Sequence, residues 1–204
     1  MDILSTWKNE NESGEQVSKW EMVRLGDVCD VVSGYASNSK LFTTEDKGKP
    51  IIRIRDVLRG YSETNTTEDY HENYLIRKGD LLIGMDGEFN ISPWNSGDAL
   101  LNQRVCKIQS TSDNLENKYL LFFLPKVLKE IENATSFVTV KHLSSKTILD
   151  IQIPLPDKKV QQLITEVLEK TRKLIAKRKE QIAKLDLLVK SQFDTQYASN
   201  HFAA

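Results

Sequence analysis

Two short motifs have residue types and spacings that could support catalysis, and each lacks a required partner. Gly48-Lys49 could close a phosphate-binding loop, but Thr43 stands where that loop needs glycine and Pro50 follows the lysine. Pro156-Asp157 could open a nuclease motif, but no Asp/Glu-x-Lys sequence follows it. An amino-methyltransferase would need an Asn/Asp-Pro-Pro-aromatic corner, and the chain contains no Pro-Pro pair. We therefore predict that the chain is not an enzyme.

The residues that bind metals in proteins are present but poorly spaced. Zinc sites need closely spaced ligands, whereas the three histidines are scattered: His71, His142 and His201. One loop region contains three carboxylates that could bind a cation: Asp86, Glu88 and Asp98. Carboxylates in a Gly/Asn-rich loop are more often solvated, so we expect no metal and no cofactor on this chain.

The composition is that of a folded water-soluble protein. The chain has 204 residues, of which 39% are hydrophobic and 28% charged. No run approaches the roughly 20 apolar residues that span a bilayer, and the first residues do not form a secretory signal. Cys29 and Cys106 stand in apolar contexts, which favours buried reduced thiols over a disulfide. We expect a cytoplasmic location.

Charge is unevenly distributed along the chain. Residues 1–19 have 2 Lys/Arg and 4 Asp/Glu, a net charge of −2; residues 20–153 have 16 and 19, or −3; residues 154–204 have 10 and 6, or +4. A nucleic-acid-binding surface in the central part would therefore depend on local clustering of basic residues and on partners for non-specific affinity.

The central part has the pattern of an irregular α+β domain with a mixed sheet. We predict that residues 1–19 are a flexible lead-in and that residues 20–33 form a strand and a helical turn. We predict a strand at 51–57, with Arg53 and Arg55 on one face, and further strands at 81–84 and 104–108. Long polar loops are expected at 60–73 and 85–98, and such loops are usually functional.

The C-terminal half is mainly helical. Residues 116–132 have helical periodicity, and we expect Pro125 to kink or split that helix. A short helical turn and a strand should follow, ending at Pro154 and Pro156. Asp157 is a suitable N-cap for a long helix at 157–195, followed by a tail at 196–204. At 1.5 Å per residue, a helix of about 35 residues would be about 50 Å long.

The long helix has an apolar stripe with heptad spacing and polar interruptions. Leu168, Ile175, Ile182 and Val189 recur every seven residues, whereas Thr171 and Arg178 interrupt the seam. We predict that the dimerisation residues are those of this stripe: Leu168, Leu174, Ile175, Ile182, Leu185, Leu188 and Val189. The stripe is too long for the preceding domain to cover, so the helix needs a partner helix.

The order of these local signals resembles the specificity subunits of type I restriction–modification systems. The opening resembles a target recognition domain in the segments Arg24-Leu25-Gly26-Asp27-Val28, Ile52-Arg53-Ile54-Arg55-Asp56-Val57 and Gly79-Asp80-Leu81-Leu82-Ile83. The later matches are Leu101-Asn102-Gln103-Arg104-Val105, Lys141-His142-Leu143-Ser144, Ile151-Gln152-Ile153-Pro154-Leu155-Pro156 and Gln161-Gln162-Leu163-Ile164. With Trp20 and Ser33-Gly34 near the start and Leu187-Leu188 and Phe193 near the end, the resemblance covers residues 20–195. A full subunit has two recognition domains and two spacer helices, whereas this chain has one of each.

The resemblance implies a recognition domain at 20–156 that grips a few base pairs of double-stranded DNA. The spacer helix would pair antiparallel with a second copy, so that a homodimer reads two short blocks separated by a gap. Methyl transfer from S-adenosylmethionine would belong to a modification subunit, and cleavage driven by ATP and Mg²⁺ to a restriction subunit. Two alternatives stay open: a coiled-coil scaffold without DNA readout, and one half of a split or truncated specificity subunit.

Within the resemblance, polar side chains that flank the strands are the candidates for DNA contact. Arg and Lys suit guanine and phosphate, and Asn suits adenine. The predicted DNA-binding residues are Ser37, Asn38, Lys40, Arg53, Arg55, Arg59, Asn90, Arg104, Lys141 and His142. For each, the alternative is a solvated residue or an Arg–carboxylate pair such as Arg55 with Asp56. We interpret Asn102 and Gln103 as structural and Trp94 as a loop anchor.

The long helix also contains a basic run, namely Lys170, Arg172, Lys173, Lys177, Arg178 and Lys179. The favoured interpretation is a solvated face. Contact with a partner is the next, and tracking of DNA phosphates across the gap is a further alternative.

Overall fold

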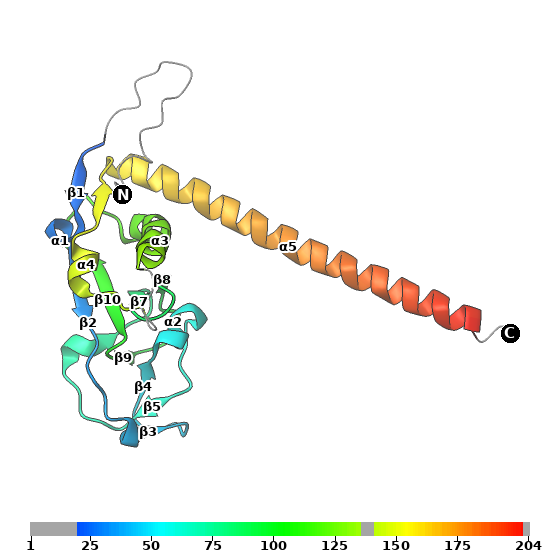
Figure 1. Cartoon of the computed structure of the whole chain (residues 1–204), viewed down its shortest axis with the longest axis horizontal. Coiled ribbons are helices and arrows are strands. Elements are labelled where there is room, and N and C mark those ends of the chain that lie inside the picture. Colours follow the sequence, from blue (N-terminus) through cyan, green and yellow to red (C-terminus); the bar gives the residue numbers. More distant parts are fainter. Residues whose placement is uncertain (1–19, 136–140, 202–204) are drawn as a thin grey trace, which may run out of the picture.

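The computed structural model describes residues 20–135 and 141–201, with side chains to residue 193. It is an α+β domain from which one long helix projects (Figure 1). The predicted flexible lead-in at 1–19 lies outside the described residues. The α+β domain and the long C-terminal helix confirm the fold class predicted from the sequence.

A four-stranded antiparallel sheet forms the centre of the domain. Its order is β2 (Cys29–Ser33), β10 (Val105–Ser110), β7 (Leu81–Gly84) and β8 (Asn90–Pro93). Alternate side chains of β7 point to opposite faces, as a pleated strand requires. Leu81 and Ile83 belong to one hydrophobic cluster, and Leu82 belongs to the other. The sheet thus separates two hydrophobic cores.

The larger core lies between this sheet and α3 (Asn117–Ala134). Leu120, Leu124 and Leu128 are fully buried in it. The fully buried Cys106 and the buried Cys29 also belong to it, and burial raises the pKa of each thiol to about 12. Both cysteines are free and buried, as predicted, and the raised pKa disfavours the thiolate form.

The smaller core connects the central sheet with a second, mixed sheet. The order of the second sheet is β3 (Phe42–Thr43), β5 (Asn65–Thr66), β4 (Lys49–Ile52), β9 (Ala99–Leu101) and β6 (Leu75–Ile76). Only the β4–β9 pair among these is parallel. The short α2 (Ile54–Arg59) contacts β7 and β8. Trp94 is buried in this core, and its indole Nε1 donates a hydrogen bond to the Gly97 carbonyl at 2.7 Å, which confirms it as a loop anchor.

The ends of the domain meet beside the long helix. The chain enters through β1 (Met22–Arg24) and α1 (Leu25–Val28), and β1 pairs with β11 (Gln152–Pro154), which follows α4 (Ser145–Leu149). The long helix α5 (Lys158–His201) begins directly after Asp157, as predicted, and extends past residue 195. The backbone N–H of Gln161 donates to the Asp157 carbonyl at 3.0 Å.

Three predictions about elements were wrong. Residues 51–57 do not form one strand: β4 ends at Ile52, and α2 follows because the Asp56 carboxylate accepts a hydrogen bond from the Arg53 N–H at 3.0 Å. The predicted loop 85–98 contains β8, which completes the central sheet. Of the two effects expected of Pro125, a kink or a split, the split is wrong, because α3 continues from Asn117 to Ala134.

Candidate nucleic-acid interface

Polar loops gather at one end of the central sheet. Because β2, β7, β8 and β10 are antiparallel neighbours, the ends of β2 and β7 lie beside the beginnings of β8 and β10. The segments 34–37, 85–89 and 102–104 leave or enter these strand ends. Residues 141–142 join them, because Asp86 and His142 form an isolated bridge. We call these four segments the loop end.

Asp86 connects three segments of the loop end. Its carboxylate forms an ion pair with Arg104 and a hydrogen bond with His142 Nδ1 at 2.6 Å. Only 15% of the Asp86 side chain is exposed, whereas Arg104 and His142 are 52% and 55% exposed. The largely buried carboxylate thus holds two exposed, hydrogen-bonding side chains side by side. In the sequence, the place of Asp86 in a loop with other carboxylates indicates only a possible cation ligand.

Backbone contacts reinforce this arrangement. The Met85 N–H donates to the Arg104 carbonyl at 3.0 Å, and the Leu143 N–H donates to the Met85 carbonyl at 2.7 Å. The Gly87 N–H donates to the Lys141 carbonyl at 3.0 Å. The main chain on both sides of Asp86 is therefore fixed, so Arg104 and His142 are presented from a rigid base.

Glu132 at the end of α3 anchors the other side of the loop end. Its carboxylate accepts a hydrogen bond from the Phe89 N–H at 3.0 Å and one from Lys129 Nζ at 2.7 Å. The hydrogen bond with Lys129 lowers the pKa of Glu132 and raises the pKa of Lys129. Lys141 Nζ donates to the Glu132 carbonyl at 2.5 Å. No local sequence signal marks Glu132, because it lies far along the chain from Phe89.

A close backbone approach joins β2 to the turn at 102–104. A Cβ atom on Gly34 would lie 2.2 Å from the Asn102 carbonyl oxygen, so only glycine fits. Tyr35 forms a bridge with Asn102, and the Asn102 N–H donates to the Ile52 carbonyl at 3.3 Å. These backbone contacts support the structural interpretation of Asn102. They also place Arg53, the residue after Ile52, beside the loop end.

The predicted DNA-binding residues fall into three groups. The structure brings four to the loop end or its margin with exposed or half-exposed side chains: Arg53, Arg104, Lys141 and His142. Asn90 is the first residue of β8 and also lies at this end of the sheet. Its side-chain amide donates to the Glu88 carbonyl at 3.1 Å and so turns toward its own loop. Ser37 lies at the margin, where its N–H donates to the Tyr35 carbonyl at 3.0 Å.

The second group, Asn38 and Lys40, lies where the chain passes to the second sheet. The Asn38 side chain accepts a hydrogen bond from the Lys40 N–H at 3.1 Å and caps the short 3-10 helix Ser39–Leu41. The Asn38 N–H donates to Glu68 at 2.9 Å. Asn38 is thus occupied in a turn, while the Lys40 side chain is exposed and forms no ion pair among the described residues.

The third group, Arg55 and Arg59, lies on α2 and is paired with carboxylates. Arg55 lies 3.8 Å from Asp56, and Arg59 lies 3.9 Å from Asp56 and 3.4 Å from Glu63. The Asn95 N–H, which follows β8, donates to the Gly60 carbonyl at the end of α2. Arg59 therefore lies toward the opposite end of the central sheet. The structure does not bring it to the loop end.

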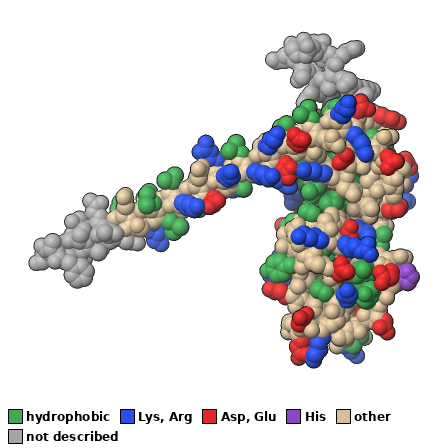
Figure 2. Space-filling view, turned by 180° about the vertical axis from the view of Figure 1, so that it is seen from behind, with side chains coloured by type: hydrophobic (Ala, Val, Ile, Leu, Met, Phe, Trp, Pro, Cys, Tyr) green, Lys and Arg blue, Asp and Glu red, His purple; other side chains and the backbone are tan. Residues whose placement is uncertain are grey.

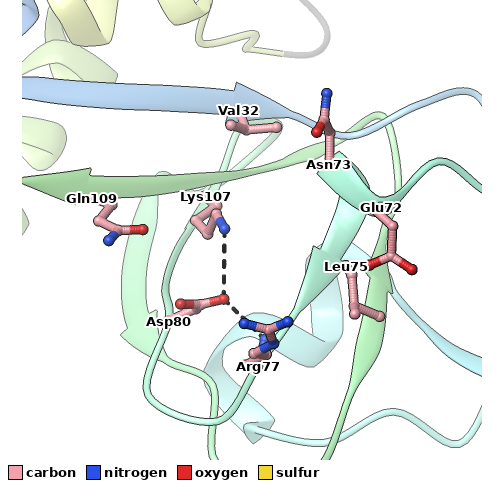
Figure 3. Close-up of a pocket in the computed structure, with 8 residues that line it drawn as sticks. All are labelled: Val32, Glu72, Asn73, Leu75, Arg77, Asp80, Lys107 and Gln109. Atoms are coloured by element: carbon pink, nitrogen blue, oxygen red, sulfur yellow. Dashed lines mark hydrogen bonds and ion pairs between the residues drawn. The ribbon is translucent and has the colours of Figure 1, made fainter. Parts of the chain in front are cut away.

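A polar pocket of about 470 Å³ lies apart from the loop end (Figure 3). Lys107 and Gln109 on β10 line one side, and Arg77 and Asp80 line the other. Lys107 Nζ lies 3.8 Å from the Asp80 carboxylate. Charges of both signs meet here, so the pocket is not a positive surface for a polyanion. Among residues 20–135 and 141–193, no cluster of three His, Cys, Asp or Glu residues could hold a metal ion.

The long helix exposes its apolar stripe. The exposed fractions of Leu168, Leu174, Ile175, Ile182, Leu185, Leu188 and Val189 range from 41% to 59%. Figure 2 shows hydrophobic side chains standing out along the projecting helix, interspersed with Lys and Arg. Lys170 and Lys173 pair with Glu166 and Glu169 one turn earlier, at 3.6 and 3.8 Å, as expected on a solvated face. No described helix is long and apolar enough to cross a membrane.

The structure has two parts: a mixed α+β domain with polar loops at one sheet end, and a projecting helix with an uncovered apolar stripe. Residues 17–186 match the model of the type I restriction modification DNA specificity domain. The chain therefore belongs to this family, and the resemblance seen in the sequence is confirmed.

The relatives of the chain include two curated specificity subunits. The specificity subunit of the type I restriction enzyme EcoBI from Escherichia coli is 42% identical over 150 residues, which are 74% of this chain and 32% of that protein. The MjaVIII specificity subunit from Methanocaldococcus jannaschii is 28% identical over 193 residues, covering 85% of this chain and 45% of that protein. The chain thus spans less than half the length of these relatives.

Solved structures share the fold. The crystal structure of the HsdS subunit from Thermoanaerobacter tengcongensis has a TM-score of 0.64 at 20% identity, covering 82% of this chain and 41% of that one. A chain from a study of assembly and conformational transition of the type I R-M system has a TM-score of 0.70 at 22% identity, covering 88% and 45%. At these identities the likeness shows the fold alone.

Proposed function

We propose that the chain is a sequence-specific DNA-binding specificity subunit that works as a homodimer on a bipartite target. The carrying observation is the exposed apolar stripe of α5. Soluble proteins rarely leave such a stripe uncovered. A second copy supplies both a helix to cover it and a second recognition domain.

The loop end is the proposed DNA-reading surface. Arg104 and His142 are exposed and held by Asp86. Arg53 lies beside the loop end, and its side chain is exposed and forms no ion pair among the described residues. Guanidinium groups contact guanine and phosphate, and fixed side chains discriminate between bases better than mobile ones. Arg55 and Arg59 are paired elsewhere, so we propose contacts by the loop end and Lys40 in their place.

The catalytic steps belong to partners in this proposal. The chain directs a DNA methyltransferase subunit, which binds S-adenosylmethionine, and a restriction subunit that uses ATP and Mg²⁺. The family membership supports these partners. The isolated chain should neither bind S-adenosylmethionine nor methylate DNA. Methylation by the chain alone would contradict the proposal.

The methylation motif in cells tests the proposal. We expect long-read sequencing of DNA from cells that produce the chain with its methyltransferase to show one motif. A two-fold dimer should give two inverted copies of one short block, separated by a fixed gap. Omitting the chain should abolish the motif. An asymmetric motif would instead indicate pairing with a different half subunit, and a contiguous motif would contradict bipartite readout.

The salt dependence of binding tests the role of Lys40. Replacing Lys40 with Ala should weaken DNA binding, because one phosphate contact is lost. The fall of log K with log salt should become shallower, with a slope about one unit less negative. Lys47→Ala is the matched control, since Lys47 pairs with Glu45 at 2.6 Å. An unchanged slope in Lys40→Ala would place the DNA elsewhere.

A further inference from the structure

The beginning of α5 is fixed to the recognition domain, and the rest of the helix is free. Gln161 and Thr165 are buried, whereas every described side chain from residue 170 to 193 is exposed. Figure 1 shows the helix passing beside α3 near its start and then leaving the domain. The direction of the free part is therefore determined within the first turns.

Gln161 makes the central contacts of this junction. Its side chain is fully buried. Its Oε1 accepts a hydrogen bond from the Glu116 N–H at 3.0 Å, and its Nε2 donates to the carbonyls of Asn114 and Pro156, both at 2.7 Å. One amide thus joins α5, the residues that precede α3 and the segment that enters α5. It also satisfies the N–H of Glu116, the N-cap residue of α3.

Weaker contacts surround this amide on the same side of α5. Gln162 donates to the Glu116 carboxylate at 3.0 Å, and Glu169 pairs with Lys118 at 2.7 Å. The Arg172 guanidinium lies 5.1 Å from the centre of the Phe122 ring. These exposed contacts are individually weak, so they can support the orientation of α5 but cannot define it as the three hydrogen bonds of the buried Gln161 side chain can.

We infer that Gln161 is a positioning residue that fixes the angle between α5 and the recognition domain and thereby restricts the gap between the two DNA half-sites. The effect on the DNA gap rests on the proposed function. From Gln161 to Val189 the helix is about 42 Å long at 1.5 Å per residue. A change of about 10° at the junction would move its far end by about 7 Å, or roughly two base-pair steps. Helix length alone therefore cannot specify one gap without a rigid junction.

The distance distribution between two spin labels tests the junction directly. One label is placed at Lys78→Cys on an exposed turn of the domain, and the other at Lys190→Cys on the exposed part of α5. The distance between them reports the angle between α5 and the domain. Dilution with unlabelled chain removes the signals between copies. Gln161→Met keeps the approximate volume but loses all three hydrogen bonds, so its distribution should be at least twice as wide as that of the unsubstituted protein. The matched control, Gln162→Ala, should keep the original width. An unchanged width in Gln161→Met would overturn the inference, whatever the chain binds.

The gap preference tests the consequence for recognition. The complex with the methyltransferase is used to select DNA from a pool in which the gap between half-sites varies. The unsubstituted chain should enrich one gap length, and Gln161→Met should enrich at least two adjacent lengths with the same half-site sequences. Retention of one gap by Gln161→Met would overturn the link to spacing. Failure of the unsubstituted chain to enrich any bipartite site would contradict the proposed function, while the spin-label result would still decide the role of Gln161.

Discussion

At the residue scale, the candidate site depends on carboxylates as much as on cations. Asp86 and Glu132 each bind groups from segments far apart in sequence, and neither is a DNA contact in the proposal. The exposed residues Arg104 and His142 could be predicted from their types and their places beside strands. Their common anchor could not, because Asp86 meets them only once β7 and β10 are paired and residues 141–142 fold back over Met85.

Removal of the Asp86 charge should lower specificity while it raises non-specific binding. In Asp86→Asn the ion pair with Arg104 is lost, so the fixed geometry of Arg104 and His142 loosens. We expect the ratio of specific to non-specific DNA affinity to fall about tenfold, corresponding to about 1.4 kcal/mol. Non-specific affinity should rise because one negative charge is removed from the surface. Competition binding with unrelated duplex measures both, and Glu88→Gln is the neighbouring control. An unchanged ratio would contradict the role of Asp86.

Glu132 should make the loop end sensitive to acid. Its pKa is lowered from the ordinary value of 4.5, first by the hydrogen bond with Lys129. Because the folded-state pKa lies below the unfolded one, the stabilisation is complete above pH about 4.5 and is lost as the pH falls through the lower folded value. Glu132→Gln should therefore be less stable than the unsubstituted chain at pH 7, and the difference should shrink below about pH 4.

Urea unfolding at a series of pH values measures this difference. Glu130→Gln is the matched control, because Glu130 is on the same helix but makes a longer ion pair with Lys126, at 3.9 Å. A difference that stays constant between neutral pH and about pH 3 would contradict the role given to Glu132.

At the element scale, periodic segments were predictable and short irregular ones were not. The buried strand at 81–84, the helix at 116–132 and the long helix after Asp157 all appear in the structure. The prediction for 51–57 was wrong because an Asp56 cap competes with β-propensity over a few residues. Strand β8 was missed because its stability comes from pairing with β7 and from Trp94, which local sequence does not reveal.

The contact of Gly34 with the turn at 102–104 should be intolerant of any side chain. A Cβ would meet the Asn102 carbonyl oxygen at 2.2 Å, and both are fixed by the backbone. Gly34→Ala should lower the free energy of unfolding by about 2 kcal/mol or more. Gly97→Ala is the control, because a Cβ on Gly97 would meet no heavy atom within 4 Å and its φ is not positive. Thermal or urea unfolding compares the two. Equal stability of both variants would contradict the close approach.

At the scale of the whole molecule, the chain consists of two parts with different proposed partners. In the proposal, the recognition domain presents the loop end to DNA, and α5 presents its apolar stripe to a second copy. Sequence periodicity predicted the stripe. The length of the stripe also predicted that the domain would not cover it. The residue at which that cover ends required the structure, because only the packing of α5 on α3 shows that the side chains from 170 to 193 are exposed. The alternative of a scaffold without DNA readout leaves the organised loop end without a role.

The molar mass of the chain in solution tests the central claim most directly. Multi-angle light scattering at micromolar concentration should give twice the chain mass of 23.3 kDa. Ile175→Asp with Ile182→Asp should give the mass of one chain and abolish specific DNA binding, because charges would be buried in the seam, while circular dichroism shows the recognition domain still folded. Lys177→Asp with Lys184→Asp, also seven residues apart, should remain dimeric. A single-chain mass for the unsubstituted protein, alone and with the methyltransferase, would contradict self-pairing and the inverted-repeat target.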